Sequence, residues 1–356
     1  MYRIFAALAL AGVLAACSSS GGGSPLTSTD SVGVGTCNQP LVSDEAECAT
    51  DDNTSAPPAD PSDPDVYARQ FSDDLTVSGM SYDTASGELV LDNVPFDGDD
   101  NVYRRNATAS TRINATSGSS FGFFANDRGT AGSPTTEFFA VFRRSPDDYS
   151  QVGALGTNRY VSYGFGGAAA QRLNGDGSLP NANQSYVFQG EYAAVRTIVE
   201  EGTNTVVQYV SGTSRLEVDI QDFNNVGAVE GIIADRRFFD LNGVEVPEMA
   251  GGVGDFISLA TAEINFDDWT ITSSDATLQI PNSVDKDTTN IASATPNTQT
   301  ATGNWAGLFA GPNGEEVAGI VFVEGTGPVG IDTSTGSPII LTHNQVRETG
   351  VFQAKR

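Results

Sequence analysis

Histidine, cysteine and tryptophan are scarce in this sequence, and their scarcity excludes several kinds of site. The 356 residues include one histidine, three cysteines and two tryptophans. Any Ser-His-Asp or Cys-His centre would have to use His343, and no Gly-x-Ser-x-Gly nucleophile motif accompanies it. A zinc site requires several histidine or cysteine ligands. We therefore predict no catalytic residues, no metal site and no cofactor, so the chain is predicted not to be an enzyme.

Positive charge is also scarce. Lysine and arginine together number 18 against 45 acidic residues, which gives a formal net charge of −27. With no basic patch to offset phosphate repulsion, nucleic-acid binding is disfavoured. The acidity has two readings, which the composition leaves open: solubility in a salty or calcium-rich medium, or attraction of a basic partner.

Long hydrophobic runs are absent after the first 17 residues. Arg3 precedes an apolar run from Ile4 to Ala16 that is too short for a permanent membrane-spanning helix. The run ends in Leu-Ala-Ala-Cys, which resembles the lipobox of bacterial lipoproteins. The resemblance implies lipidation of Cys17, with residues 1–17 as signal peptide, and Ser18 after it favours the outer membrane. Residues 18–64 are rich in serine, glycine, proline and aspartate, as expected of a flexible tether.

The two other cysteines lie within this tether. An exported chain meets an oxidising compartment, and two remaining thiols there most simply form one disulfide. We therefore predict a local disulfide between Cys37 and Cys48.

Convincing amphipathic helices are missing as well, whereas glycine is abundant and turn signals recur along the chain. In "SRLEVDIQDF", Leu216, Val218 and Ile220 alternate with polar residues, and "AEINFDDW" repeats the pattern. In "YVFQGEYAAVRTIV" the face of Tyr186 and Phe188 alternates less cleanly. Such period-2 segments are typical of strands with one buried face, and their number predicts an all-β sandwich or barrel.

A composition break at 172–185 divides the ordered part of the chain. It contains glycines, a proline and three asparagines but few apolar residues. We place a β-rich domain at 65–178 and a second domain at 182–356. Within the break, Asn174–Ser178 has oxygen ligands at alternate positions, and Asp97–Asn101 is similarly acidic. Both segments are read either as weak calcium loops or as turns.

The stretch "GLFAGPNGEEVAGIVF" near the C-terminus reads as two strands joined by a Gly-Pro-Asn-Gly turn. Glu315 and Glu316 follow the turn, and paired carboxylates can be the acid and base of a glycosidase. Adjacent side chains in a strand point to opposite faces, however, so this pair cannot flank one glycosidic bond.

The same stretch resembles the closing hairpin of the barrel domain in transferrin-binding protein B and its lipoprotein relatives. The positions that match the family pattern are, in order, Gly307, Phe309, Gly311, Pro312, Asn313, Glu316, Gly319 and Phe322. Gly314 and Ala318 depart from it mildly. The segments "SYVFQGEYAAVR" and "LEVDIQDFNNVGAVEGIIADRRFF" also look like strands of that domain, so the similarity covers roughly residues 184–353.

This resemblance implies a handle-like β domain followed by an eight-stranded antiparallel barrel, in a lipid-anchored protein of Gram-negative bacteria. The family captures host proteins or haem, often beside an outer-membrane transporter or translocon, through variable loops. Our leading hypothesis is therefore a surface-exposed outer-membrane lipoprotein that binds a solute or protein ligand, with iron or haem acquisition as its narrower form. The alternatives are an acidic structural coat protein and an envelope hydrolase.

Overall fold

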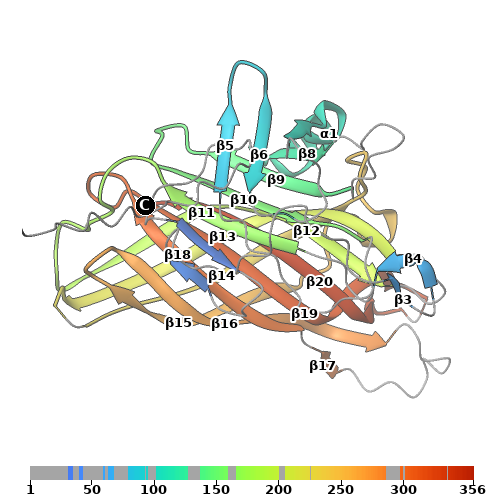
Figure 1. Cartoon of the computed structure of the whole chain (residues 1–356). Helices are drawn as coiled ribbons and strands as arrows, with labels where there is room; N and C mark the ends of the chain where they lie inside the picture. The colour runs from blue at the N-terminus through green and yellow to red at the C-terminus, as the bar shows by residue number, and fades with distance from the viewer. Residues whose placement is uncertain are drawn as a thin grey trace, which may run out of the picture.

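The described part of the chain forms two β-sheet units. The computed structural model describes residues 31–34, 40–42, 59–60, 63–67, 79–92, 94, 102–126, 137–158, 166–199, 205–224, 226–285, 297–299, 301–334 and 336–356. These ranges include none of the three cysteines, Cys17, Cys37 and Cys48. The candidate loop Asp97–Asn101 also lies outside them. The two units are arranged one above the other in Figure 1.

The first unit is an antiparallel sheet of nine strands. In spatial order they are β2 (Pro40–Val42), β1 (Ser31–Val34), β11 (Gly166–Arg172), β10 (Ser150–Gly156), β9 (Phe139–Arg144), β8 (Gly122–Asn126), β7 (Val102–Arg105), β6 (Glu88–Asp92) and β5 (Gly79–Asp83). The tip of the β5–β6 hairpin projects beyond the rest of the sheet (Figure 1), whereas Met80 and Leu91 at its base lie beside Gly153 of β10.

Strands β1 and β2 lie within residues 18–64, the segment predicted to be a tether. Strand β1 pairs with the edge of β11, with Ser31 opposite Gln171 and Val34 opposite Ala168. Elsewhere in the same segment, β3 (Ala59–Asp60) pairs with β4 (Asp63–Tyr67).

The second unit is a closed antiparallel barrel of eight strands, as predicted. They are β12 (Gln184–Val199), β13 (Thr205–Asp222), β14 (Val226–Phe239), β15 (Phe256–Asn265), β16 (Thr270–Asp285), β18 (Ala301–Ala310), β19 (Glu316–Asp332) and β20 (Ile339–Lys355). Pairing of β15 with β16 closes the barrel, and β12 with β20 joins its first and last strands. The short β17 (Asn297–Gln299) pairs with β16 outside the ring.

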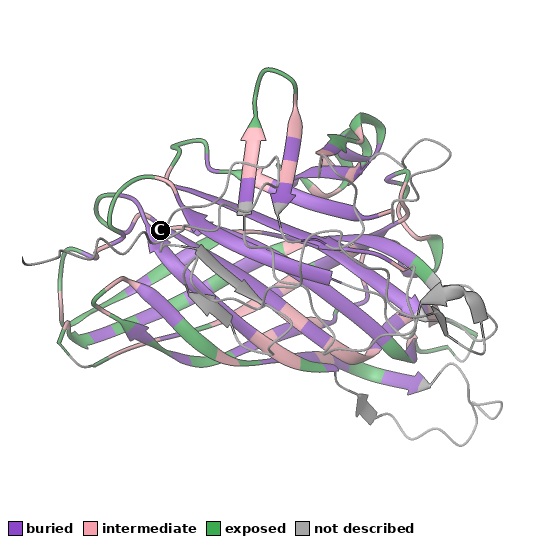
Figure 2. Cartoon of the chain, viewed as in Figure 1, coloured by how far each residue is buried: buried purple, intermediate pink, exposed green. Residues whose placement is uncertain are grey.

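Alternation along the strands confirms the predicted faces. Leu216, Val218 and Ile220 are buried in the barrel, whereas Glu217 and Asp219 beside them are exposed. Figure 2 shows the same alternation along β13, β14 and β15. The inward residues of the barrel strands meet in one hydrophobic core, so the barrel interior is occupied by the chain's own side chains.

A second apolar layer lies between the two units. On β12, Ala194 belongs to the barrel core, whereas its neighbours Ala193 and Val195 face the first sheet. Residues from β13, β18, β19 and β20 complete the barrel's side of this layer. The first sheet contributes residues that include Phe123 and Val141. The strands next to this layer are buried along most of their length (Figure 2).

Helix α1 (Ala107–Ser117) packs on this layer and was not expected from the sequence. Its buried residues are Ala109, Ser110 and Ile113, too few to produce a clear apolar stripe. Its ends do carry signals: the Asn106 side chain accepts a hydrogen bond from the amide of Ala109, and Gly118 adopts a left-handed conformation. A 3₁₀ turn, η1 (Pro247–Met249), lies in the β14–β15 connection.

Candidate functional site

The Gly-Pro-Asn-Gly turn of the predicted hairpin joins β18 to β19 at one end of the barrel. It packs against the segment that links the two units: the Gly177 amide donates to the Gly311 carbonyl (3.1 Å), and the Gly311 amide donates to the Asn174 carbonyl (3.1 Å). Gly175 has a φ of +80°, and a Cβ there would collide with the backbone of Gly311 and Pro312. The glycines of both segments therefore allow two backbones to approach closely.

The linking segment itself is a turn. Asp176 Oδ1 accepts hydrogen bonds from the Ser178 amide (3.0 Å) and hydroxyl (2.8 Å). These bonds, the backbone one first, lower the pKa of Asp176. Leu179, two residues after Gly177, is buried in the barrel core and covers this end of it. Of the two readings left open, the contacts favour turn chemistry for this segment.

Other residues of the hairpin motif pack inside the barrel or on its outer face. Phe309 points into the barrel and contacts Phe188, with ring centroids 6.0 Å apart. Gly307 and Gly319 are register partners, and a Cβ at Gly319 would collide with the Phe352 ring inside the barrel. Phe322 lies on the outer face under the guanidinium of Arg347, 5.5 Å from the ring centroid.

Glu315 and Glu316 have different surroundings, and neither projects into the barrel. Glu315 is half-buried and accepts hydrogen bonds from the amide (2.9 Å) and side chain (2.8 Å) of Asn313. Asn313 follows Pro312 in the turn, and Pro312 is exposed. Burial opposes ionisation of Glu315, but the bonds from Asn313 outweigh it and lower the pKa. Glu315 therefore caps the turn.

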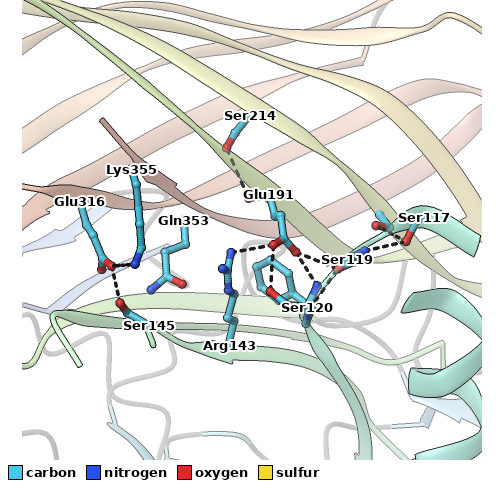
Figure 3. Close-up of polar contacts among 12 residues, drawn as sticks. Ser117, Ser119, Ser120, Arg143, Ser145, Glu191, Ser214, Glu316, Gln353 and Lys355 are labelled. Carbon is cyan, nitrogen blue, oxygen red and sulfur yellow. Dashed lines mark hydrogen bonds and ion pairs between the residues drawn. The ribbon is translucent and has the colours of Figure 1, made fainter. Parts of the chain in front are cut away.

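Glu316 is fully buried between the barrel and the first sheet (Figure 3). It accepts hydrogen bonds from the hydroxyls of Ser145 and Ser150, the second at 2.8 Å, and lies 3.2 Å from the Lys355 ammonium. Lys355 also pairs with Asp147. This carboxylate therefore joins the two units, and it shares the Lys355 ammonium with Asp147.

Glu191 makes a second polar joint between the units, also drawn in Figure 3. Its carboxylate accepts from the Ser120 amide (2.6 Å), the Ser120 hydroxyl (2.9 Å) and the Ser119 hydroxyl (3.2 Å), and lies 3.3 Å from Arg143. Both joints place a barrel carboxylate among hydroxyls and a cation. Sequence analysis did not single out Glu191.

A charged cluster is buried inside the barrel toward its other end. Arg236 pairs with Asp255 and Glu348, and Tyr192 donates to Glu348 Oε1 at 2.7 Å. All four side chains are 0–2% exposed. Burial raises the pKa of Asp255 and of Tyr192.

Arg196 lies next to this cluster. It donates to Gln208 Oε1 (2.9 Å) and its guanidinium lies 4.7 Å from the centroid of the Phe238 ring. Burial lowers its pKa to about 10. With two arginines and two carboxylates, the buried charges balance, which is the condition under which ions persist in an apolar interior.

The remaining predicted chemistry is placed as follows. His343 is buried in β20, where its Nδ1 accepts from the Asn344 amide at 3.0 Å. Among the described residues, no group of three or more histidine, cysteine or acidic side chains is placed to hold a metal ion. No helix in the described ranges is long and apolar enough to cross a membrane.

Comparison with known proteins finds likeness only among solved structures. No protein-family model matches the chain, and no curated protein matches it. Transferrin-binding protein B from Haemophilus parasuis is similar at 14% identity and a TM-score of 0.33, over 78% of this chain and 42% of that one. The same protein from serogroup B Neisseria meningitidis is similar at 17% identity and a TM-score of 0.29, over 65% of this chain and 36% of that one.

A structure described as a surface lipoprotein is similar at 16% identity and a TM-score of 0.30, over 60% of this chain and 79% of that one. This chain thus spans well under half the length of the transferrin-binding protein B structures it matches. The fold assignment rests on the strand pairing described above.

Proposed function

We propose that this chain is a lipid-anchored outer-membrane protein, attached through Cys17 and exposed at the cell surface, that binds a protein partner and catalyses no reaction. The observation that carries the proposal is the filled barrel. Its inward residues, among them Phe188, Trp305 and Phe352, form one packed core, so recognition is left to the outer walls, turns and loops.

Two further observations support a recognition role. The buried carboxylates Glu191 and Glu316 are engaged in joining the units, and the acids Asp255 and Glu348 are paired with Arg236. None of these four is therefore free to act as a general acid or base. In its narrower form, the proposal makes the partner a carrier of iron or haem whose cargo passes to an outer-membrane transporter.

Display and binding are tested separately. Protease treatment of intact cells that express the chain is expected to degrade it, whereas complete protection in cells with intact outer membranes contradicts surface exposure. The purified chain, immobilised and exposed to proteins of the medium or host fluid, is expected to retain a specific partner. Failure to retain any partner, with correct folding verified by circular dichroism, contradicts the binding role and favours a structural coat.

A further inference from the structure

Three partly exposed aromatic rings lie at the barrel end that also holds the Gly-Pro-Asn-Gly turn. Phe223 comes from the β13–β14 turn, and Phe266 and Trp269 come from the β15–β16 turn; we name this group the aromatic mouth. Its ring centroids are 5.4–5.9 Å apart, and all three pairs are steeply inclined. Trp269 also contacts Phe309 at 6.0 Å, so the mouth rests on the aromatic core.

The fold holds Trp269 in an unfavourable conformation. Its φ of +57° lies in the left-handed region, which bulky residues rarely occupy. Its carbonyl accepts hydrogen bonds from the Phe309 amide (3.0 Å) and from Arg172 (3.2 Å), and Arg172 also donates to the Asp268 carbonyl (2.8 Å). A side chain that only closed the barrel would not require a strained backbone together with partial exposure, and such strain accumulates at functional positions.

The two turns of the mouth carry no positive side chain of their own, and the Arg172 guanidinium beside them is bonded to the Asp268 and Trp269 carbonyls. The sequence contains no lysine or arginine from Leu216 to Asp235 or from Phe238 to Asp285, a span that includes both turns of the mouth. Within the turns, Asp222 and Asp267 are exposed carboxylates.

The barrel wall that leads to the mouth is acidic too. This acidic wall is the solvent-facing side of β13–β16, and five of its exposed carboxylates are Glu217, Asp219, Glu230, Glu263 and Asp275. Arg215 pairs with Glu217, which offsets one of the five. Beside the mouth, a hollow of about 480 Å³ is lined by Asp219, Gln221 and Val226 among others.

We propose that the aromatic mouth and the acidic wall together bind a basic segment of the protein partner, with an arginine or lysine of that segment stacked on the mouth. Aromatic faces attract guanidinium and ammonium groups, and arginine-on-tryptophan contacts are common centres of binding energy. The wall's single sign of charge would orient and accelerate encounter with a basic surface. This inference rests on the proposed binding function and names the surface and the partner's chemistry.

A fluorescence and calorimetry experiment tests it on the full chain. The probe is an eight-residue peptide of alternating arginine and glycine, compared with a glutamate–glycine peptide of equal length. The arginine peptide is expected to bind saturably and to change tryptophan emission. Trp305, which is fully buried in the barrel core, is the internal control. In a Trp269→Phe variant Trp305 is the one remaining tryptophan, so the peptide should bind with little change in affinity but should leave the tryptophan emission unchanged.

Variants separate the mouth from general charge attraction. Trp269→Gly removes the ring and suits a left-handed backbone. It should weaken binding at least tenfold at a temperature where its circular dichroism spectrum matches that of the parent, although loss of the contact with Phe309 lowers its Tm. Asp267→Asn should weaken binding about three- to tenfold. Asp275→Asn makes the same charge change on the wall, eight residues after Asp267. It should weaken binding too, but by a smaller factor than Asp267→Asn, because Asp275 lies farther from the stacked cation.

Several results would overturn the inference. These are equal losses in Asp267→Asn and Asp275→Asn with no effect of Trp269→Gly, equal binding of the glutamate peptide, or no saturable binding of the arginine peptide at low salt. Equal retention of a captured partner by the parent and by Trp269→Gly would refute this surface alone. Capture of no partner by the parent would refute the proposed function instead.

Discussion

The buried charged side chains of this barrel are stabilised by one another and not by solvent. Arg236 is the common partner of Asp255 and Glu348, and all three side chains are almost completely buried. Removing the arginine would leave two carboxyls without their cation in an apolar interior. A buried pair is therefore expected to be much more sensitive to loss of one partner than an exposed pair.

The substitution Arg236→Met should lower the free energy of unfolding by about 3–5 kcal/mol, measured by urea titration. The matched control is Arg215→Met on β13, the strand next to that of Arg236. It removes the exposed partner of Glu217 and should change the free energy of unfolding by about 0–1 kcal/mol. Similar losses in the two variants would contradict the view that Arg236 holds the cluster together.

Another residue-scale prediction concerns pH. Glu245 lies in the β14–β15 connection and accepts two hydrogen bonds from Arg237, both 2.8 Å, and one from the Gly251 amide, 2.8 Å. The bonds from Arg237 lower the pKa of Glu245 despite partial burial. The folded-state pKa is thus below the unfolded value, so the pair stabilises the fold above the unfolded-state pKa and loses this effect as pH falls through the folded-state pKa.

Glu245→Gln should therefore reduce the dependence of stability on pH in the acid range where glutamate titrates, as followed by urea titrations at a series of pH values. Glu217→Gln, which lies on an exposed strand face, is the comparison. An unchanged acid slope in Glu245→Gln would contradict the assignment.

At the scale of single elements, the hairpin and the linking segment constrain each other through glycine. Gly175 and Gly87 both have left-handed φ values, +80° and +71°. A Cβ at Gly175 would lie 2.5 Å from the Pro312 nitrogen, whereas a Cβ at Gly87 would have nothing within 4 Å. The pair of sites therefore separates backbone strain from steric collision.

Gly87→Ala should lower stability by about 1–2 kcal/mol through strain alone. Gly175→Ala should lower it by a further ~1–3 kcal/mol because the linking segment must move away from the turn. Thermal unfolding of both variants measures the difference. Equal effects would mean that the linking segment relaxes freely, against the close packing described here.

Elements with regular alternation could be predicted from the sequence, and elements defined by contacts could not. The faces of Leu216, Val218 and Ile220 follow directly from their period of two, and so does the all-β class, whereas the barrel itself was implied by the family resemblance. Helix α1 buries only three residues, so its cap residues were its main signal. Arg196 follows Tyr192 by four residues and Ala194 by two. This even spacing along β12 predicts that all three side chains lie on the same, inward face of the strand.

The site was less accessible to sequence reasoning than the fold. That Glu316 faces the first sheet and Glu315 caps the turn depends on how the two units pack, which no local pattern records. The aromatic mouth likewise unites Phe223 with Phe266 and Trp269, about 45 residues apart in the chain, through pairing of β14 with β15. This pairing joins two separate hairpins, which no local sequence pattern records.

For the whole molecule, the decisive feature is the apolar layer between the first sheet and the barrel. Its barrel side comes from outward residues of β12, β13, β18, β19 and β20, which would face water if the first sheet were removed. The polar joints at Glu191 and Glu316 lie within the same contact. Burial of an apolar face on this scale should couple the two units, so we expect them to unfold in a single calorimetric transition.

Strand β12 provides a matched pair of sites for testing that coupling. Val195 and Val187 both point outward from the barrel, but Val195 is 2% exposed against the first sheet, whereas Val187 is 43% exposed to solvent. Val195→Asp places an unpaired carboxylate in the apolar layer and should lower stability by more than about 3 kcal/mol. Val187→Asp should change it by about 0.5 kcal/mol or less. Calorimetry distinguishes the consequences: if Val195→Asp splits one transition into two, the barrel retains its own stability, whereas a single transition at lower temperature means that both units fold only together.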